Sequence, residues 1–260
     1  MKIDRVDLEN AGNERDTSVA IDVLRAFTTA AFAFDSGAIE IFPVSTIDEA
    51  FNLQKEIPES LLMGEMHGVP VEGFNLGNSP TEVSKFDLSG RRIIHRSTAG
   101  TQGIVKSAES KRILAASLCN VSATVSAIQS LAPNSLTLVE TGVFEGGWGD
   151  EDRACGDAIE AILFGEEVAY ASILERVKNS RSGSHFTDVD HRVFPASDLQ
   201  LALQVDCFDF FMRVEREDGR LVMRRHDAAQ AASERLTRSR RPCRWAPLAG
   251  SSADRLWRSA

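Results

Sequence analysis

Four carboxylate side chains of this chain stand where predicted strands end or helices begin. Asp22 ends a buried apolar run, and Glu65 follows Leu61-Leu62-Met63 closely. Glu151 and Asp152 open a predicted helix. Mg²⁺ prefers oxygen ligands, and proteins commonly hold it with one or two carboxylates plus water and substrate oxygens. The four residues therefore predict a Mg²⁺ site, in which Asp22 binds the metal with one or more of the other three.

Two polar loops and one arginine could bind an anion beside these carboxylates. Segment 73–80, Gly-Phe-Asn-Leu-Gly-Asn-Ser-Pro, and segment 97–101, Ser-Thr-Ala-Gly-Thr, mix glycines with short polar side chains. Glycine lets backbone amides approach an anion. Arg25, one helical turn after Asp22, could fork onto phosphate or sulfonate oxygens. The predicted substrate-binding residues are Gly77, Asn78, Ser79, Thr98, Gly100 and Thr101.

Carboxylates, an arginine and short donors together favour phosphate ester hydrolysis, because a phosphate dianion needs cationic or N–H partners and its transfer needs charge stabilisation. We predict Asp22, Arg25 and Glu65 as catalytic residues. Attack by water at the metal is the first mechanistic choice, and attack by Asp22 to form an aspartyl-phosphate is the second. Structural alternatives exist for each residue: Asn78-Ser79-Pro80 suits a turn and helix N-cap, and acidic residues suit any helix N-terminus.

The elements that must position these residues alternate between apolar runs and helical segments. We expect strands at 19–24, 38–44, 61–63, 92–95, 113–116 and 136–139. Helices are expected at 28–35, 103–110, 121–131, 151–164 and 167–179, with a capping box from Thr46 to Glu49 at the start of another helix. This alternation predicts an α/β protein, a three-layer α/β/α domain with a largely parallel or mixed sheet.

The rhythm changes after about Arg181. Runs 208–214 and 220–224 flank Glu217-Asp218-Gly219, which predicts a C-terminal hairpin, because Asp-Gly is a strong hairpin signal. We expect residues 1–229 to form one phosphatase-like domain, or two closely packed lobes, and residues 230–260 to form a poorly ordered Arg/Ser-rich tail.

The composition of the chain limits the classes of partner that we expect it to bind. The chain has 260 residues and a net charge of -9, which argues against nucleic-acid binding. No apolar run reaches the length needed to span a membrane, and the N-terminus lacks a secretory h-region. The four cysteines have no CxxC spacing, so we expect reduced thiols and a cytoplasmic location. The sequence also allows a homodimer, in which the edge of the hairpin could pair with a second copy of the chain.

The motifs in their order resemble those of the 2-phosphosulfolactate phosphatases. The resemblance runs from about Val19 to Val214 and rests on Asp22-Val-Leu-Arg25-Ala26, Gly64-Glu65, the loops 73–80 and 98–101, Asn120, Glu151-Asp152, Ser180-Arg-Ser-Gly183 and Asp206. It implies a Mg²⁺-dependent phosphomonoesterase that hydrolyses 2-phosphosulfolactate to sulfolactate and phosphate, a step toward coenzyme M. The implied partner is a small phosphorylated (sulfo)carboxylic acid.

Two positions depart from the family pattern. Ala99 stands where the family usually has asparagine, and Asn75 stands where it has aspartate. Two alternatives therefore accompany the main prediction. One is a phosphatase of another small phosphorylated acid, and the other is a non-catalytic homologue that binds such an anion.

Overall fold

The computed structural model of this chain describes residues 1–13, 15–143, 149–187 and 193–227. The predicted tail at 230–260 lies outside the described residues. Among the described residues, no helix is long and apolar enough to cross a membrane.

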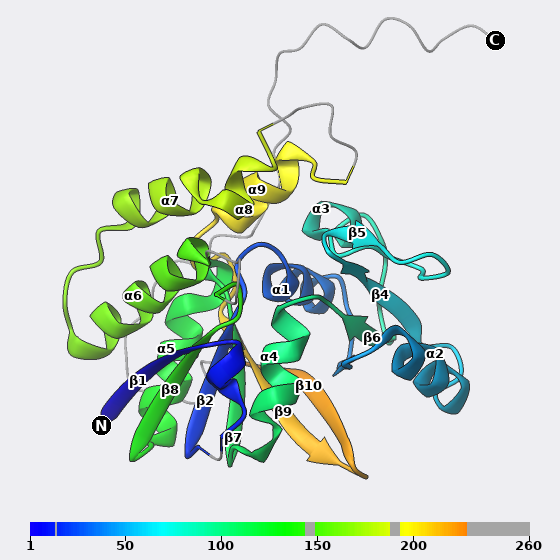
Figure 1. Cartoon of the computed structure of the whole chain (residues 1–260), viewed down its shortest axis with the longest axis horizontal. Helices are drawn as coiled ribbons and strands as arrows, with labels where there is room; N and C mark the ends of the chain where they lie inside the picture. The colour runs from blue at the N-terminus through cyan, green and yellow to red at the C-terminus, as the bar shows by residue number, and fades with distance from the viewer. Residues whose placement is uncertain (14, 144–148, 188–192, 228–260) are drawn as a thin grey trace, which may run out of the picture.

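The described strands form a ten-stranded mixed sheet in the order β1-β8-β2-β7-β9-β10-β3-β6-β4-β5 (Figure 1). The strands β1, β8, β2 and β7 are parallel to one another, as are β3, β6 and β4. The β9–β10 hairpin joins the two groups and is antiparallel to its neighbour on each side. The bounds are β1 Lys2–Asp7, β2 Thr17–Ile21, β3 Glu40–Pro43, β4 Leu61–Met66, β5 Val69–Pro70, β6 Arg92–Arg96, β7 Arg112–Ala116, β8 Ser135–Glu140, β9 Phe210–Glu217 and β10 Arg220–Asp227.

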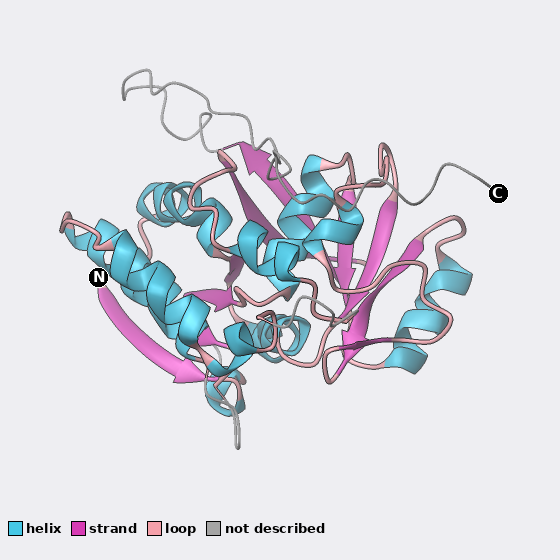
Figure 2. Ribbon diagram, turned by 90° about the horizontal axis from the view of Figure 1, so that it is seen from above, coloured by secondary structure: helices cyan, strands magenta, loops and turns pink. Residues whose placement is uncertain are grey.

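Helices cover both faces of this sheet, and Figure 2 shows the layers from above. Alternate residues of β2 point to opposite faces: Ala20 packs in the cluster that holds Phe27 of α1, whereas Val19 and Ile21 pack with Ile128 of α5 and residues of α6. The three-layer α/β/α prediction is therefore confirmed. The bounds are α1 Ala26–Asp35, α2 Ile47–Glu56, α3 Pro80–Val83, α4 Gly100–Lys106, α5 Val121–Leu131, α6 Asp150–Phe164, α7 Tyr170–Asn179, α8 Arg181–Ser184 and α9 Ala196–Ala202.

The predicted hairpin forms, but it does not offer a free edge. Strands β9 and β10 lie in the interior of the sheet, where β9 pairs with β7 and β10 pairs with β3 through Met223 and Ile41. The expectation that this edge could pair with a second copy is therefore wrong. The apolar residues of β9, such as Phe210 and Met212, are buried in the core instead.

Several element boundaries differ from the prediction. Strand β1 was not expected, because its sequence Lys-Ile-Asp-Arg-Val-Asp is rich in charge, yet it pairs in parallel with β8. Helix α4 begins at Gly100 rather than 103, and α7 begins at Tyr170 rather than 167. At α2 the hydroxyl of Thr46 accepts the Glu49 amide at 3.0 Å, but the Glu49 carboxylate accepts from Ser45, one residue earlier than a capping box requires.

Candidate active site

A pocket of about 370 Å³ opens where strands from both parallel groups end. Its wall takes residues that follow β2, β6 and β8, together with Glu65 of β4 and the first turn of α6. The predicted site residues that line it are Asp22, Arg25, Glu65, Asn78, Thr98, Glu151 and Asp152. The four predicted carboxylates therefore share one pocket, although they lie far apart in the sequence.

Asp22 directly follows β2 and caps the start of α1. Its Oδ1 accepts the Ala26 amide at 2.9 Å, and its side chain is buried. A Cβ atom on Gly100 would lie 2.6 Å from Asp22 Oδ2, so only glycine allows the first turn of α4 to approach this carboxylate. Gly100 thus stands behind Asp22 and does not belong to the pocket lining.

The first turn of α6 supplies two carboxylates with different surroundings. Asp152 Oδ1 accepts the Val23 amide at 2.9 Å, and its Oδ2 accepts the Gly142 amide at 2.7 Å. Glu151 is 2% exposed, and its Oε2 has no hydrogen-bond partner among the described residues. Asp152 is thus fixed by the backbone, while a buried oxygen of Glu151 stays unsatisfied.

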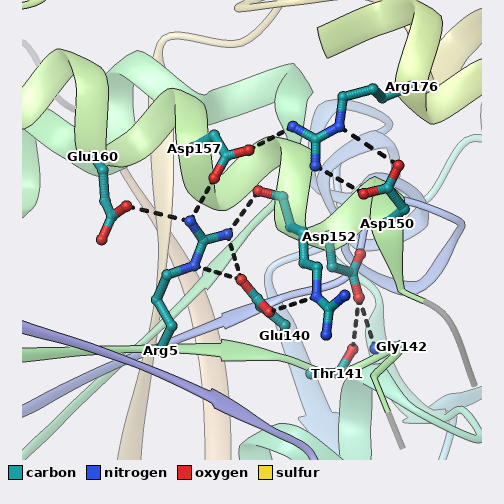
Figure 3. Close-up of polar contacts among 10 residues, drawn as sticks. Arg5, Glu140, Thr141, Gly142, Asp150, Asp152, Asp157, Glu160 and Arg176 are labelled. Carbon is teal, nitrogen blue, oxygen red and sulfur yellow. Dashed lines mark hydrogen bonds and ion pairs between the residues drawn. The ribbon is translucent and has the colours of Figure 1, made fainter.

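An ion-pair network behind the pocket holds α6 against the sheet (Figure 3). Arg5 of β1 donates to Glu140 of β8 at 2.6 Å and to Asp157 of α6 at 2.5 Å. A Cβ atom on Gly156 would lie 2.7 Å from Arg5 Nη2, so this glycine makes room for the guanidinium. Arg176 of α7 binds the same Asp157 from the other side. The network fixes the helix whose first turn reaches the pocket.

Glu65 has both carboxylate oxygens engaged at the end of β4. Its Oε2 accepts the Gly68 amide at 2.5 Å and the Thr98 hydroxyl at 2.9 Å, while the Thr98 amide binds its Oε1. Thr98 follows β6, so this contact ties two neighbouring strand ends together. Thr98 lines the pocket as a partner of Glu65.

Arg25 lines the pocket, but several of its N–H donors point away from the carboxylates of the pocket. Its Nη1 donates to Asp198 at 2.8 Å and to the Val193 carbonyl at 2.9 Å. Its guanidinium carbon lies 5.3 and 5.0 Å from the ring centres of Phe186 and Phe194. Within the described residues, Asp198 is the only carboxylate at ion-pair distance from Arg25.

The loop at 73–80 is largely structural. Ser79 is the N-cap of α3, and the Gly77 amide donates to Glu82 at 2.8 Å. Asn75 Oδ1 accepts the Leu62 amide at 2.8 Å, so the departure from aspartate preserves this bond and stands outside the pocket. Asn78 alone of this loop lines the pocket.

Two further features lie behind the lining. Thr101 is fully buried and its hydroxyl accepts the Ser97 amide at 2.8 Å, so it supports the loop before α4. His95 Nε2 lies 3.3 Å from Asn78 Oδ1. Burial lowers the pKa of His95 to about 3, so its imidazole is neutral beside the Asn78 amide. Gly77, Ser79, Gly100 and Thr101 therefore support the pocket wall without forming it.

Crowded carboxylates dominate the electrostatics of the pocket. Burial raises the pKa of Asp22 to about 7, against a hydrogen bond from Ala26, and repulsion from Glu65 and Glu151 adds to the rise. Burial likewise raises the pKa of Asp152 well above its usual range, with repulsion from Asp22 and Glu151. The pocket therefore favours a bound proton or a bound cation.

The 2-phosphosulpholactate phosphatase family model matches residues 3–217 of this chain. The chain belongs to this family. The family comprises phosphoric monoester hydrolases, and the match spans the strands and the first turn of α6 that build the pocket.

Curated relatives agree with this membership. A probable 2-phosphosulfolactate phosphatase of Bacillus subtilis is 32% identical over 78% of this chain and 88% of its own length. A protein of the same name from Carboxydothermus hydrogenoformans is 46% identical over 44% of this chain and 48% of its own length. A third, from Deinococcus radiodurans, is 35% identical over 61% of this chain and 67% of its own length.

The pocket of this phosphatase also contains residues that were not predicted to belong to the site. Ser182 belongs to the Ser180-Arg-Ser-Gly183 motif but was given no role, and it lines the pocket together with Arg181 and His185. Phe186 and Phe194 add an apolar wall. The motif itself was a usable signal for Arg181 and Ser182. Nothing local marks the two phenylalanines, since isolated aromatic residues are typical of any core.

The donor set of this phosphatase fits a hard cation. Among the described residues, no group of three or more His, Cys, Asp or Glu side chains forms a ready metal site. However, Glu151 Oε2 is buried without a partner, and the pKa of the neighbouring Asp22 is raised to about 7. Carboxylate oxygens are the ligands that Mg²⁺ prefers, and Mg²⁺ usually completes its shell with water and substrate phosphate.

Proposed function

We propose that this chain hydrolyses 2-phosphosulfolactate to sulfolactate and phosphate with Mg²⁺ as its cofactor. The observation that supports this most strongly is that four buried carboxylates share one pocket with Arg25 and Asn78. The pocket volume of about 370 Å³ suits a small phosphorylated acid. Family membership supports the phosphatase activity, and the relatives' names support the substrate.

The hydrogen bonds of each carboxylate suggest which of the four would bind the metal and which would orient the site. Asp22 and Glu151 would hold Mg²⁺. Glu151 Oε2 has no hydrogen-bond partner among the described residues, and Asp22 Oδ2 lies 3.5 Å from the Thr141 hydroxyl, a longer contact than the 2.9 Å hydrogen bond from Ala26 to Asp22 Oδ1. Asp152 and Glu65 have both oxygens bound by backbone amides, so they would orient the site and add negative charge. Bound Mg²⁺ would act as a Lewis acid on the phosphoryl oxygens.

The remaining lining residues would bind the substrate's anionic groups. The side chain of Asn78, which His95 contacts from behind, would donate through its amide nitrogen. Arg25 would contribute a buried positive charge opposite the carboxylates. Phe186 and Phe194 would exclude water from this side of the pocket.

A phosphate-release assay tests the proposal, using 2-phosphosulfolactate and a panel of other phosphorylated C3 acids with Mg²⁺ or with a chelator. We expect release from 2-phosphosulfolactate that requires Mg²⁺ and exceeds release from the panel. If the protein prefers another acid, that acid takes the place of 2-phosphosulfolactate as the proposed substrate. If no acid releases phosphate, the protein is instead a non-catalytic anion-binding protein.

Two matched variants on the same helix localise the site. Glu151→Gln removes a proposed metal ligand and should lower kcat by roughly 100-fold or more. Glu160→Gln makes the same substitution on α6, where Glu160 binds Arg5 at 3.2 Å outside the pocket, and should keep kcat within about threefold. Equal activity of the two variants would contradict the site.

A further inference from the structure

Asp198 of α9 is a fully buried carboxylate that stands behind the pocket wall. It is 0% exposed and is not part of the pocket lining. Its Oδ2 accepts from Arg25 at 2.8 Å, and its Oδ1 accepts from the Ser79 hydroxyl at 2.7 Å and the Thr81 amide at 3.0 Å. One side chain thus joins the pocket arginine to the loop that carries Asn78.

Arg25 faces two competing sets of carboxylates. Four acidic side chains line the same pocket as Arg25, whereas Asp198 binds the guanidinium from outside the lining. A guanidinium that turned toward Asp22 or Glu151 would neutralise a proposed metal ligand and occupy the place of the substrate anion. The carbonyls of Val193 and Gly68 and the ring of Phe194 also fix the arginine on the Asp198 side.

A role in stability alone does not account for this arrangement. Burying an ion pair costs desolvation energy, and an apolar pair of the same volume is often equally stable. The ion pair fixes the orientation of Arg25, because a planar guanidinium binds a carboxylate in a defined geometry. The second oxygen of Asp198 extends that geometry to Ser79, the residue after Asn78.

We propose that Asp198 is a positioning residue for substrate binding: it holds Arg25 away from the pocket carboxylates and in register with the Asn78 segment. This inference rests on the proposed function. Asp198 acts through Arg25 and touches neither substrate nor metal. Its loss should therefore weaken binding of the anionic substrate more than it slows the chemical step.

The test is the steady-state kinetics of phosphate release by Asp198→Asn, which keeps the shape and removes the charge. We expect KM and the inhibition constant of inorganic phosphate to rise together by roughly 10-fold or more, with kcat within about threefold. Glu40→Gln is the matched control, because Glu40 pairs with Arg92 at 2.8 Å away from the pocket, and its KM should stay unchanged.

A double-mutant comparison separates positioning from folding. Arg25→Lys should raise KM, and adding Asp198→Asn to it should raise KM no further, because Asp198 acts through Arg25. A purely structural role would lower the amount of active protein and leave KM unchanged. If Asp198→Asn does not fold, Asp198→Glu, which retains the charge but shifts the carboxylate, takes its place with the same expectation.

Two results would overturn the inference: an unchanged KM in a folded position-198 variant, or independent effects of the two substitutions in the double mutant. Failure of the proposed function is distinguishable, since the wild-type protein would then release no phosphate. In that event, calorimetric binding of inorganic phosphate supplies the affinities for the same comparison. A weaker affinity in the position-198 variant still supports the inference, and an equal affinity overturns it.

Discussion

Replacing Asp22 by asparagine should stabilise the metal-free protein while abolishing its activity. Asp22 is buried beside other carboxylates, and its pKa is raised from 3.8 to about 7. A carboxylate whose pKa is higher in the folded state binds its proton more tightly there, so its ionisation disfavours folding as pH rises. Asparagine keeps the shape and removes this charge.

The magnitude follows from the two pKa values. At pH 8.5 ionised Asp22 costs about 4 kcal/mol of folding free energy relative to a neutral side chain, since each pKa unit is worth about 1.4 kcal/mol. At pH 5.5 Asp22 is protonated in the folded protein and ionised in the unfolded chain. Folding at this pH therefore has to protonate the side chain, which costs about 2 kcal/mol. The advantage of Asp22→Asn should therefore grow by about 2 kcal/mol across this range, mostly below pH 7.

The assay is urea unfolding followed by circular dichroism, in a chelator at pH 5.5 and at pH 8.5. Added Mg²⁺ should then stabilise the wild type more than Asp22→Asn at pH 8.5, because a ligand that binds only the folded state stabilises it. Asp157→Asn is a control of opposite sign. Burial raises the pKa of Asp157, but hydrogen bonds from Arg176 and Arg5 outweigh burial and lower it, so this variant should be less stable than the wild type at pH 8.5. Equal stability of Asp22→Asn and wild type at pH 8.5 would refute the electrostatic argument.

Three further substitutions have defined expectations. Asn75→Asp keeps the acceptor for Leu62, so kcat/KM should stay within about twofold and stability within about 0.5 kcal/mol; a tenfold loss of activity would place residue 75 in the site. Gly156→Ala puts a Cβ 2.7 Å from Arg5 Nη2, and thermal melts should show a loss of about 1–3 kcal/mol despite the better helix propensity of alanine; a gain would mean that Arg5 moves aside without cost. Thr46→Ala removes the N-cap of α2 and should cost about 1 kcal/mol in the same melts with unchanged kcat, whereas no loss would show that the cap adds nothing.

Local patterns predicted the elements that carry the site better than they predicted the contacts within it. Helix α5 was predicted at 121–131 and spans Val121–Leu131, because its apolar period is uninterrupted. The pairing of Arg25 with Asp198 was not predictable, since the two residues are 173 positions apart and each has an ordinary local context. Glycine-rich composition marked segment 73–80 as a binding loop, but most of its polar groups bind the chain itself, as Ser79 does in capping α3.

The convergence of Asp22 and Glu65 needs a property that no local pattern contains. Strand β9 is antiparallel to β7, β10 to β9 and β3 to β10, so the β2 and β4 groups run in opposite directions through the sheet. In a flat sheet the carboxyl ends of the two strand groups would point in opposite directions along the strands, and the carboxylates of Asp22 and Glu65 could not meet. Neighbouring strands are rotated by roughly 20–25° on average, however, and at that average the six steps from β2 to β4 would add up to roughly 120–150°.

The two strand groups meet at the β10–β3 junction, where Met223 pairs with Ile41. Glu65 and Asp22 line one pocket, and a twist of the average size accounts for how the ends of β4 and β2 come together there. The hairpin that the sequence placed at an edge is thus the part of the fold that joins the two strand groups around the pocket. A change in its length or register should displace Glu65 from Asp22 even though neither residue belongs to it.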